Sequence, residues 1–163
     1  MNATDSTPAP SIGLKRILVP IDFSACSKKA LQYAVPFAGQ FHAEVVLLHV
    51  SSLNYMVAEG FGGIDLPTLR EDLIQDAEKQ LGEILGSLDS DQMTATLVVR
   101  EGRAATEIVD LAKTENIDLI VMSTHGYSNI KHGLLGSVTE NVVRHAPCPV
   151  LVVRENEHEF IET

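Results

Sequence analysis

A glycine-rich stretch that leads into a helix is the part of this sequence best suited to binding chemistry. It reads HGYSNIKHGLLGSVTE over residues 125–140, and glycines such as Gly126 and Gly136 permit tight turns and close backbone approach. Ser137 and Glu140 have capping-box spacing, which predicts a helix that begins at this serine. The N–H groups at a helix N-terminus bind anions such as phosphate. The alternative is that the glycines only shape a loop and the serine only caps the helix.

The same stretch lacks the residues that usually transfer a phosphoryl group. The P-loop pattern GxxxxGK[ST] is absent, and neither an arginine finger nor a general base can be assigned. His125 and His132 flank the glycines, but two histidines without a suitably spaced carboxylate do not complete a metal site. Phosphates would therefore supply most of the ligands of any Mg²⁺. These residues favour binding over turnover.

The elements that must position this stretch are visible as alternating apolar patterns. Continuous apolar runs, typical of strands buried on both faces of a parallel sheet, cover residues 15–21, 44–50, 95–100, 118–122 and 149–153. Apolar residues at helical spacing lie between them, at 24–41, 69–88, 104–115 and 137–145. This alternation predicts an α/β fold, a doubly wound five-stranded parallel sheet of order 3-2-1-4-5 with helices on both faces.

The strand order of this sheet reverses between the first and fourth strands, and ligands bind beyond the carboxyl ends of strands at such a point. Asp22 follows the first strand, and the small polar residues from Ser123 follow the fourth. The topology therefore places a carboxylate opposite the start of the glycine-rich stretch. Taken alone, Asp22 is equally explained as the N-terminal cap of the helix that comes next.

Charge and composition restrict the partners. With 12 basic and 22 acidic residues the formal net charge is −10, which argues against nucleic acid and against an anionic membrane surface. Cys26 and Cys148 are far apart and form no metal-binding spacing, which fits a reducing compartment. The first residues carry no signal-peptide pattern and no apolar run is long enough to span a bilayer. We therefore expect a cytoplasmic protein.

The chain of 163 residues is about one domain long. Its first residues are rich in Ser, Thr, Pro and Ala, and its last residues are acidic. We expect a disordered segment at 1–13, an α/β domain at 14–154 and an acidic tail at 155–163. One long loop, at 51–67, is of the length that usually indicates a functional lid or disorder.

The motifs above are joined by a resemblance that covers nearly the whole chain. Residues 118–154, DLIVMSTHGYSNIKHGLLGSVTENVVRHAPCPVLVVR, resemble the signature end of the universal stress protein family. The run RILVPIDFS in the first strand, LLHV in the second and Gly102 after the third are also similar. The disordered start, the long loop and the tail lie outside the resemblance. The family fold is the doubly wound sheet predicted above.

Nucleotide-binding members of that family carry the motif G-x2-G-x9-G-[ST]. Gly126, Gly136 and Ser137 match it, whereas Ser123 stands at the first glycine, where its side chain either crowds the ligand or donates a hydrogen bond. The resemblance implies that Gly126 and the amides of residues 136–139 contact phosphates and ribose. It also implies that Asp22 contacts the nucleoside and that the backbone of Val50 contacts adenine. The implied site comprises Pro20, Ile21, Asp22, Val50, Met122, Ser123, Thr124, His125, Gly126, Gly136, Ser137, Val138 and Thr139.

The resemblance implies a regulatory protein of the stress response that binds ATP or AMP, and not an enzyme beyond slow hydrolysis of ATP. Last strands of the family commonly pair across a two-fold axis, so we expect a homodimer through Val150, Leu151, Val152 and Val153, with a further protein partner left open. The alternative is a nucleotide-free homodimeric interaction module of the same fold, which Ser123 favours. An enzyme acting on an adenylated substrate is a third possibility, for which no nucleophile and base are found.

Overall fold

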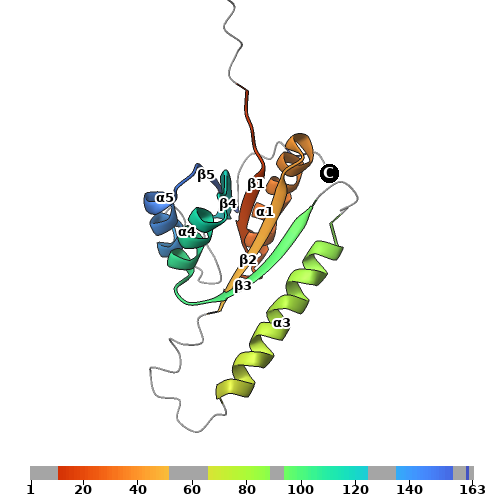
Figure 1. Cartoon of the computed structure of the whole chain (residues 1–163), viewed down its shortest axis with the longest axis vertical. Helices are drawn as coiled ribbons and strands as arrows, with labels where there is room; N and C mark the ends of the chain where they lie inside the picture. Colours follow the sequence, from red (N-terminus) through yellow and green to blue (C-terminus); the bar gives the residue numbers. More distant parts are fainter. Residues whose placement is uncertain (1–10, 52–65, 89–93, 125–134, 156–160, 162–163) are drawn as a thin grey trace, which may run out of the picture.

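The computed structural model describes residues 11–51, 66–88, 94–124, 135–155 and 161. Its elements follow one another as β1 (Arg16–Pro20), α1 (Ala25–Phe41), β2 (Glu44–Ser51), α3 (Leu66–Gly86), β3 (Ala95–Glu101), α4 (Ala104–Thr114), β4 (Leu119–Ser123), α5 (Ser137–His145) and β5 (Val150–Val153). The strands form one parallel sheet in the order β3-β2-β1-β4-β5 (Figure 1). The predicted fold class and strand order are confirmed.

The central strands are buried on both faces, which explains why their apolar runs do not alternate with polar residues. Ile17 and Val19 of β1 face a core built with α1 and α3, whereas Leu18 between them faces a second core built with α4 and α5. All three side chains are fully buried. Because side chains alternate along a strand, a run with both faces covered reads as continuously apolar. The two pairs of helices lie on opposite faces of the sheet (Figure 1).

The element bounds differ from the predicted ones by a few residues. The helix predicted at 69–88 begins at Leu66, because Pro67 is tolerated in a first helical turn. The helix predicted at 24–41 continues past Pro36 to its expected end. Most of the predicted long loop, at 52–65, and the first ten residues lie outside the described residues, so the domain boundaries stay predictions. Among the described residues, no helix combines the length and apolar character that crossing a membrane would require.

A polar network fixes the amino ends of the strands, at the edge of the sheet away from the loops that follow them. Arg16 Nε donates to the carboxylate of Glu44 at 2.9 Å, and Arg16 Nη1 donates to the carbonyl and the carboxylate of Glu115 at 2.6 and 2.7 Å. Glu44 also accepts a hydrogen bond from the hydroxyl of Thr96. The network therefore joins β1, β2 and β3 to the end of α4.

The pKa of Glu44 lies below that of an ordinary glutamate, mainly because Thr96 donates to its carboxylate; partial burial opposes the shift and Arg16 adds to it. A folded pKa below the unfolded one stabilises the fold at neutral pH, and this contribution is lost as the pH falls through the folded value. Glu44→Gln is therefore expected to make the free energy of unfolding less sensitive to acid. Urea unfolding at neutral and stepwise lower pH measures this, and equal acid sensitivity of the two proteins would contradict it.

Candidate functional site

A cleft of about 340 Å³ lies beyond the carboxyl ends of β1 and β4, where the strand order reverses. The structure brings together around it every predicted site residue that it describes: Pro20, Ile21, Asp22, Val50, Met122, Ser123, Thr124, Gly136, Ser137, Val138 and Thr139. The predicted residues His125 and Gly126 lie outside the described residues. The cleft therefore lies at the switch point, where doubly wound sheets generally bind their ligands.

Four further residues line the cleft that were not predicted: Ser27, Leu48, Ala104 and Ile108. Leu48 is two residues before Val50 and therefore on the same face of β2, a signal that the period of a strand provides. Ile108 is a buried core residue of α4, and nothing in its local pattern distinguishes it from its neighbours. The apolar wall of the cleft is therefore continuous with the second core, the one between the sheet and the helices α4 and α5.

Hydrogen bonds attach the start of α5 to the end of β4. Gly136 N–H donates to the carbonyl of Thr124 at 2.8 Å, and the hydroxyl of Thr139 donates to the carbonyl of Ser123 at 2.8 Å. Thr139 is 4% exposed, so the second bond is shielded from water. These bonds fix the N-terminus of α5 against the sheet, and the residues that form them lie on either side of the stretch 125–134 in the sequence.

The helix begins at Ser137 as predicted, but the capping box that indicated this start is not what the structure shows. The N-cap is Gly136, which is held extended at φ −60° and ψ 149° and provides no side-chain hydrogen bond, and the helix begins at Ser137. The bond from Gly136 N–H to Thr124 holds residue 136 outside the helix, so a capping box between Ser137 and Glu140 does not form. The N–H groups of residues 137–139 consequently have no partner within the helix, which leaves donors at the cleft.

Asp22 stands at the opposite side of the cleft, and its predicted alternative as a helix cap is not what the structure shows. The N-cap of α1 is Ser24, whose hydroxyl oxygen accepts from Ser27 N–H at 3.2 Å. Asp22 Oδ1 in turn accepts from Ser24 N–H at 3.1 Å and from the Ser24 hydroxyl. The carboxylate therefore orients the capping residue and is itself fixed in position at the cleft.

Helix ends, and not basic side chains, are the groups of the described cleft that can attract an anion. Among its described lining residues there is no lysine or arginine, and Asp22 is the carboxylate. Ser27, Ala104 and Ser137 belong to the first turns of α1, α4 and α5, so three helix N-termini meet at the same hollow. Each N-terminus carries about half a positive charge. The described residues contain no group of three or more side chains suited to hold a metal ion.

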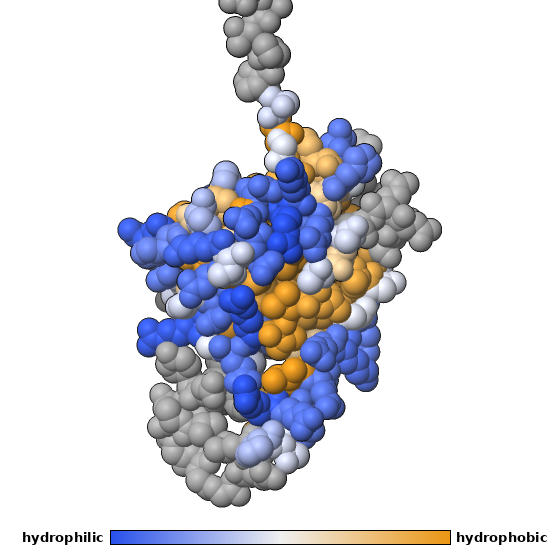
Figure 2. Space-filling model, in the orientation of Figure 1, coloured by the Kyte–Doolittle hydropathy of each residue, from blue (hydrophilic) through white to orange (hydrophobic). Residues whose placement is uncertain are grey.

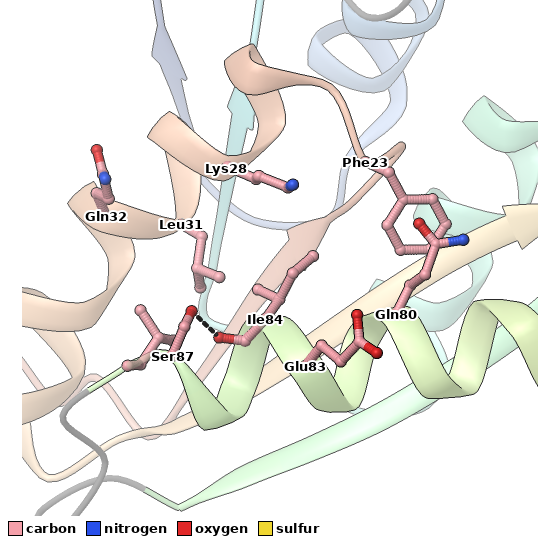
Figure 3. Close-up of a pocket in the computed structure, with 9 residues that line it drawn as sticks. Phe23, Lys28, Leu31, Gln32, Gln80, Glu83, Ile84 and Ser87 are labelled. Atoms are coloured by element: carbon pink, nitrogen blue, oxygen red, sulfur yellow. Dashed lines mark hydrogen bonds between the residues drawn. The ribbon is translucent and has the colours of Figure 1, made fainter.

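A second hollow, of about 320 Å³, lies between α1 and α3 (Figure 3). Its lining combines apolar residues such as Leu31 and Ile84 with Lys28 and Glu83 from opposite helices. Phe23 belongs to this lining, adopts a left-handed φ of 66° and stacks on His49 at 4.5 Å. This hollow is without the convergent helix ends of the switch-point cleft, which is therefore the better candidate for an anionic ligand.

Two relatives from one organism are similar to this chain over most of its sequence. Universal stress protein MJ0577 of Methanocaldococcus jannaschii is 32% identical over 157 residues, which cover 88% of this chain and 97% of the relative. Universal stress protein MJ0531 of the same organism is 36% identical over 148 residues, which cover 89% of this chain and 85% of the relative. The solved structure of MJ0577 has a TM-score of 0.74 at 31% identity and covers 90% of this chain and 100% of that chain.

Two other solved universal stress proteins share the fold at 20% identity. One is in complex with cAMP, with a TM-score of 0.63 over 88% of this chain and 98% of that chain. The other, from Archaeoglobus fulgidus, is in complex with dAMP, with a TM-score of 0.62 over 86% of this chain and 98% of that chain. The sequence profile described as the universal stress protein family matches residues 13–154. The chain therefore belongs to the universal stress protein family.

Proposed function

We propose that this chain binds an adenine nucleotide, ATP or AMP, in the switch-point cleft. The observation that carries the proposal is the meeting of three helix N-termini at a hollow with an apolar wall and one fixed carboxylate. In this assignment the N–H groups of residues 137–139 bind phosphate. Asp22 accepts hydrogen bonds from ribose hydroxyls, and the apolar wall that includes Val50 and Met122 contacts the adenine. By the family motif, Gly126 belongs to this site, and His125 beside it is part of the proposed set of residues.

The family comparison supports the class of ligand. Two proteins of this fold are named as complexes with cAMP and with dAMP, so the fold accepts adenine mononucleotides. For this chain the support comes from its own cleft, whose donors are backbone N–H groups suited to phosphate and whose wall is apolar. Any Mg²⁺ would be held mainly by the phosphates, because the described cleft offers one carboxylate.

The proposed role is regulatory, within the stress response and in the cytoplasm. Fast phosphoryl transfer usually needs lysine or arginine side chains that stabilise the charge of the transferring group. The described residues of the cleft include neither. Occupancy would instead shift the protein towards the conformation that the nucleotide binds best. Both cysteines are free thiols, as expected in a reducing compartment.

The direct test is to denature the purified protein and to separate any released nucleotide by chromatography, followed by thermal shift with Mg·ATP and with AMP. A ligand at a hundred times its dissociation constant adds about 2.7 kcal/mol to the free energy of unfolding. A Ser123→Gly variant, which restores the family glycine, is the matched comparison. Equal shifts in both proteins mean that the serine is tolerated. No nucleotide and no shift for either protein at millimolar ligand would instead support the nucleotide-free interaction module.

We also propose a homodimer through the outer edge of β5. Ile120 N–H bonds to Pro149 and Thr124 N–H bonds to Val153, so the odd-numbered residues of β5 pair with β4 and the N–H of Val152 points outward. Light scattering at micromolar concentration is expected to give twice the chain mass of 17.7 kDa. Val152→Pro removes an outward donor without removing a bond to β4 and is expected to give the monomer mass. A monomer before substitution would refute the proposal.

A further inference from the structure

The other edge of the sheet, formed by β3, is long and regular, and its charged residues Arg100 and Glu101 lie only at its end. β3 has seven residues, and all seven pair with β2 in one unbroken register from Ala95 to Glu101, without a proline or a bulge. Natural sheets normally shorten, bend or charge such an edge, because its free N–H and C=O groups attract other strands. A long regular edge is therefore expected where another strand is to be added.

The phase of the β2–β3 ladder fixes which groups of β3 point outward. Val45 N–H donates to Thr94 at one end, and Gly102 N–H donates to Ser51 at the other. In a parallel ladder the residues that bond to one neighbour alternate with those that point away. The even-numbered residues of β3 therefore bond to β2, and the N–H and C=O groups of Ala95, Leu97 and Val99 point away from the sheet. These three residues offer a regular row of donors and acceptors.

The side chains along this edge are apolar. Leu97 pairs with Leu47 in the register and is 37% exposed, which is unusual for a leucine in the middle of a strand. Val99, two residues on, faces the same side and packs against the core formed with α3. Figure 2 shows hydrophobic surface between α4 and α3, over the region where Figure 1 draws β2 and β3. A partner strand would cover this surface while pairing with the outward backbone groups.

Carboxylates of α3 border the same edge. Ala77 and Leu81 of α3 are buried against the sheet, and Gln80 and Ile84 face α1 across the hollow of Figure 3. At 100° per residue, the opposite flank of the helix, away from α1 and towards the β3 edge, carries two carboxylates seven residues apart. These are Glu71 and Glu78, both exposed and neither in an ion pair with another described residue.

The basic groups near the edge are already occupied. Arg70 pairs with Glu101 at the end of β3, and Arg100 pairs with Glu107 of α4 at 3.4 Å. The local charge that remains for a partner is therefore negative, in keeping with the net charge of −10. A second copy paired antiparallel across β3 would put the two α3 helices on the same face of a joined sheet, so their acidic flanks would oppose each other. Like charges in that position are unfavourable.

We propose that the outer edge of β3 binds an extended basic segment of another protein as an added strand. Its backbone pairs with Ala95, Leu97 and Val99, its apolar side chains cover Leu97, and its lysine or arginine side chains reach Glu71 and Glu78. The surface is separate from the nucleotide cleft and from β5, so it does not depend on either proposal. The β3 edge would thus be a second binding surface of this chain, for an extended and basic segment.

The test uses the full chain and a synthetic nine-residue peptide with blocked ends, in which lysine and valine alternate at every second position with threonine between them. Successive side chains of a strand point to opposite faces, so this spacing places both lysine and valine on the face of Leu97 and α3. We expect binding that slows hydrogen exchange of the Leu97 and Val99 amides, and no binding by the same peptide N-methylated at alternate residues. Leu97→Pro removes one outward N–H but no bond to β2 and is expected to weaken binding at least about tenfold. Leu97→Thr keeps the N–H and is expected to bind within about threefold of the parent protein.

Charge reversal tests the chosen partner even if the proline variant does not fold. Glu71→Lys combined with Glu78→Lys is expected to weaken the lysine peptide roughly three- to tenfold and to favour a glutamate–valine peptide instead. Three results would overturn the proposal. They are no binding at millimolar peptide, unchanged binding by Leu97→Pro, and slow exchange of the Val99 amide in the free protein that is concentration-dependent and lost in Leu97→Pro. The last result would identify a second copy as the occupant.

Discussion

Ser137→Asp is expected to abolish most nucleotide binding while leaving the fold at least as stable. Ser137 is the first residue of α5, where a carboxylate interacts favourably with the helix dipole by about 0.3–1 kcal/mol. The same carboxylate would stand where the proposal places a phosphate. Two like charges about 4 Å apart near a protein surface repel by about 4 kcal/mol. Because the side chain is exposed and salt screens such charges, we expect a loss of affinity of at least about tenfold.

Opposite effects on stability and binding make this variant informative. Ser137→Asn has nearly the same shape without the charge and is expected to bind within a few-fold of the parent protein. Thr106→Asp adds the same charge to the exposed first turn of α4, at a residue that does not line the cleft, and should leave affinity unchanged. Isothermal titration with AMP and thermal unfolding without ligand measure the two effects. Parent-like affinity of Ser137→Asp would show that phosphate binds elsewhere.

Leu81→Ala is expected to give the largest loss of stability of a single substitution in α3. Leu81 is fully buried in the core that α3 and α1 share with the sheet. Truncation of a buried leucine to alanine usually costs about 2–5 kcal/mol, because apolar contacts are lost and a cavity remains. A domain of ordinary stability has about 5–15 kcal/mol in total. Urea unfolding at neutral pH should therefore show a clearly lower midpoint with a similar slope.

Leu73→Ala in the same helix is the matched control, because Leu73 is 38% exposed. We expect a cost below about 1 kcal/mol, because Leu73 lies outside the buried cores, buries less apolar area than Leu81 and leaves no enclosed cavity when it is truncated. Equal costs at the two positions would mean that α3 is not held through the side chains that the structure buries. The same pair of variants also shows whether nucleotide binding at the distant cleft depends on the packing of α3.

The sequence by itself determined the sheet. Each central strand is continuously apolar because both of its faces are covered, and that pattern is legible without coordinates. Alternation of such runs with helical spacing leaves few topologies, and the structure confirms the order predicted among them. The position of the cleft followed from the same order, because the reversal point of a doubly wound sheet is a property of topology. Asp22 and Ser123 were located for that reason.

Only the tertiary structure decided which residue caps the helix of the cleft and which further residues line the hollow. The capping pattern of Ser137 and Glu140 is local, whereas the bond from Gly136 to Thr124 joins two segments distant in sequence and leaves Gly136 as the N-cap. Ile108 reaches the cleft because α4 packs on the sheet, and its own sequence neighbourhood reads as core.

The exposed edge of β3 likewise depends on the whole fold. The order of the strands places β3 at the edge, and the phase of the β2–β3 ladder decides which of its backbone groups point outward. Its residues form an apolar run that reads like the central strands, and Leu97 is exposed because β3 is the outermost strand among the described residues. Local patterns determine which residues form strands and helices, because backbone periodicity is set within a few residues. The exposure of a given side chain is set by which elements pack beside it, and that is a property of the whole fold.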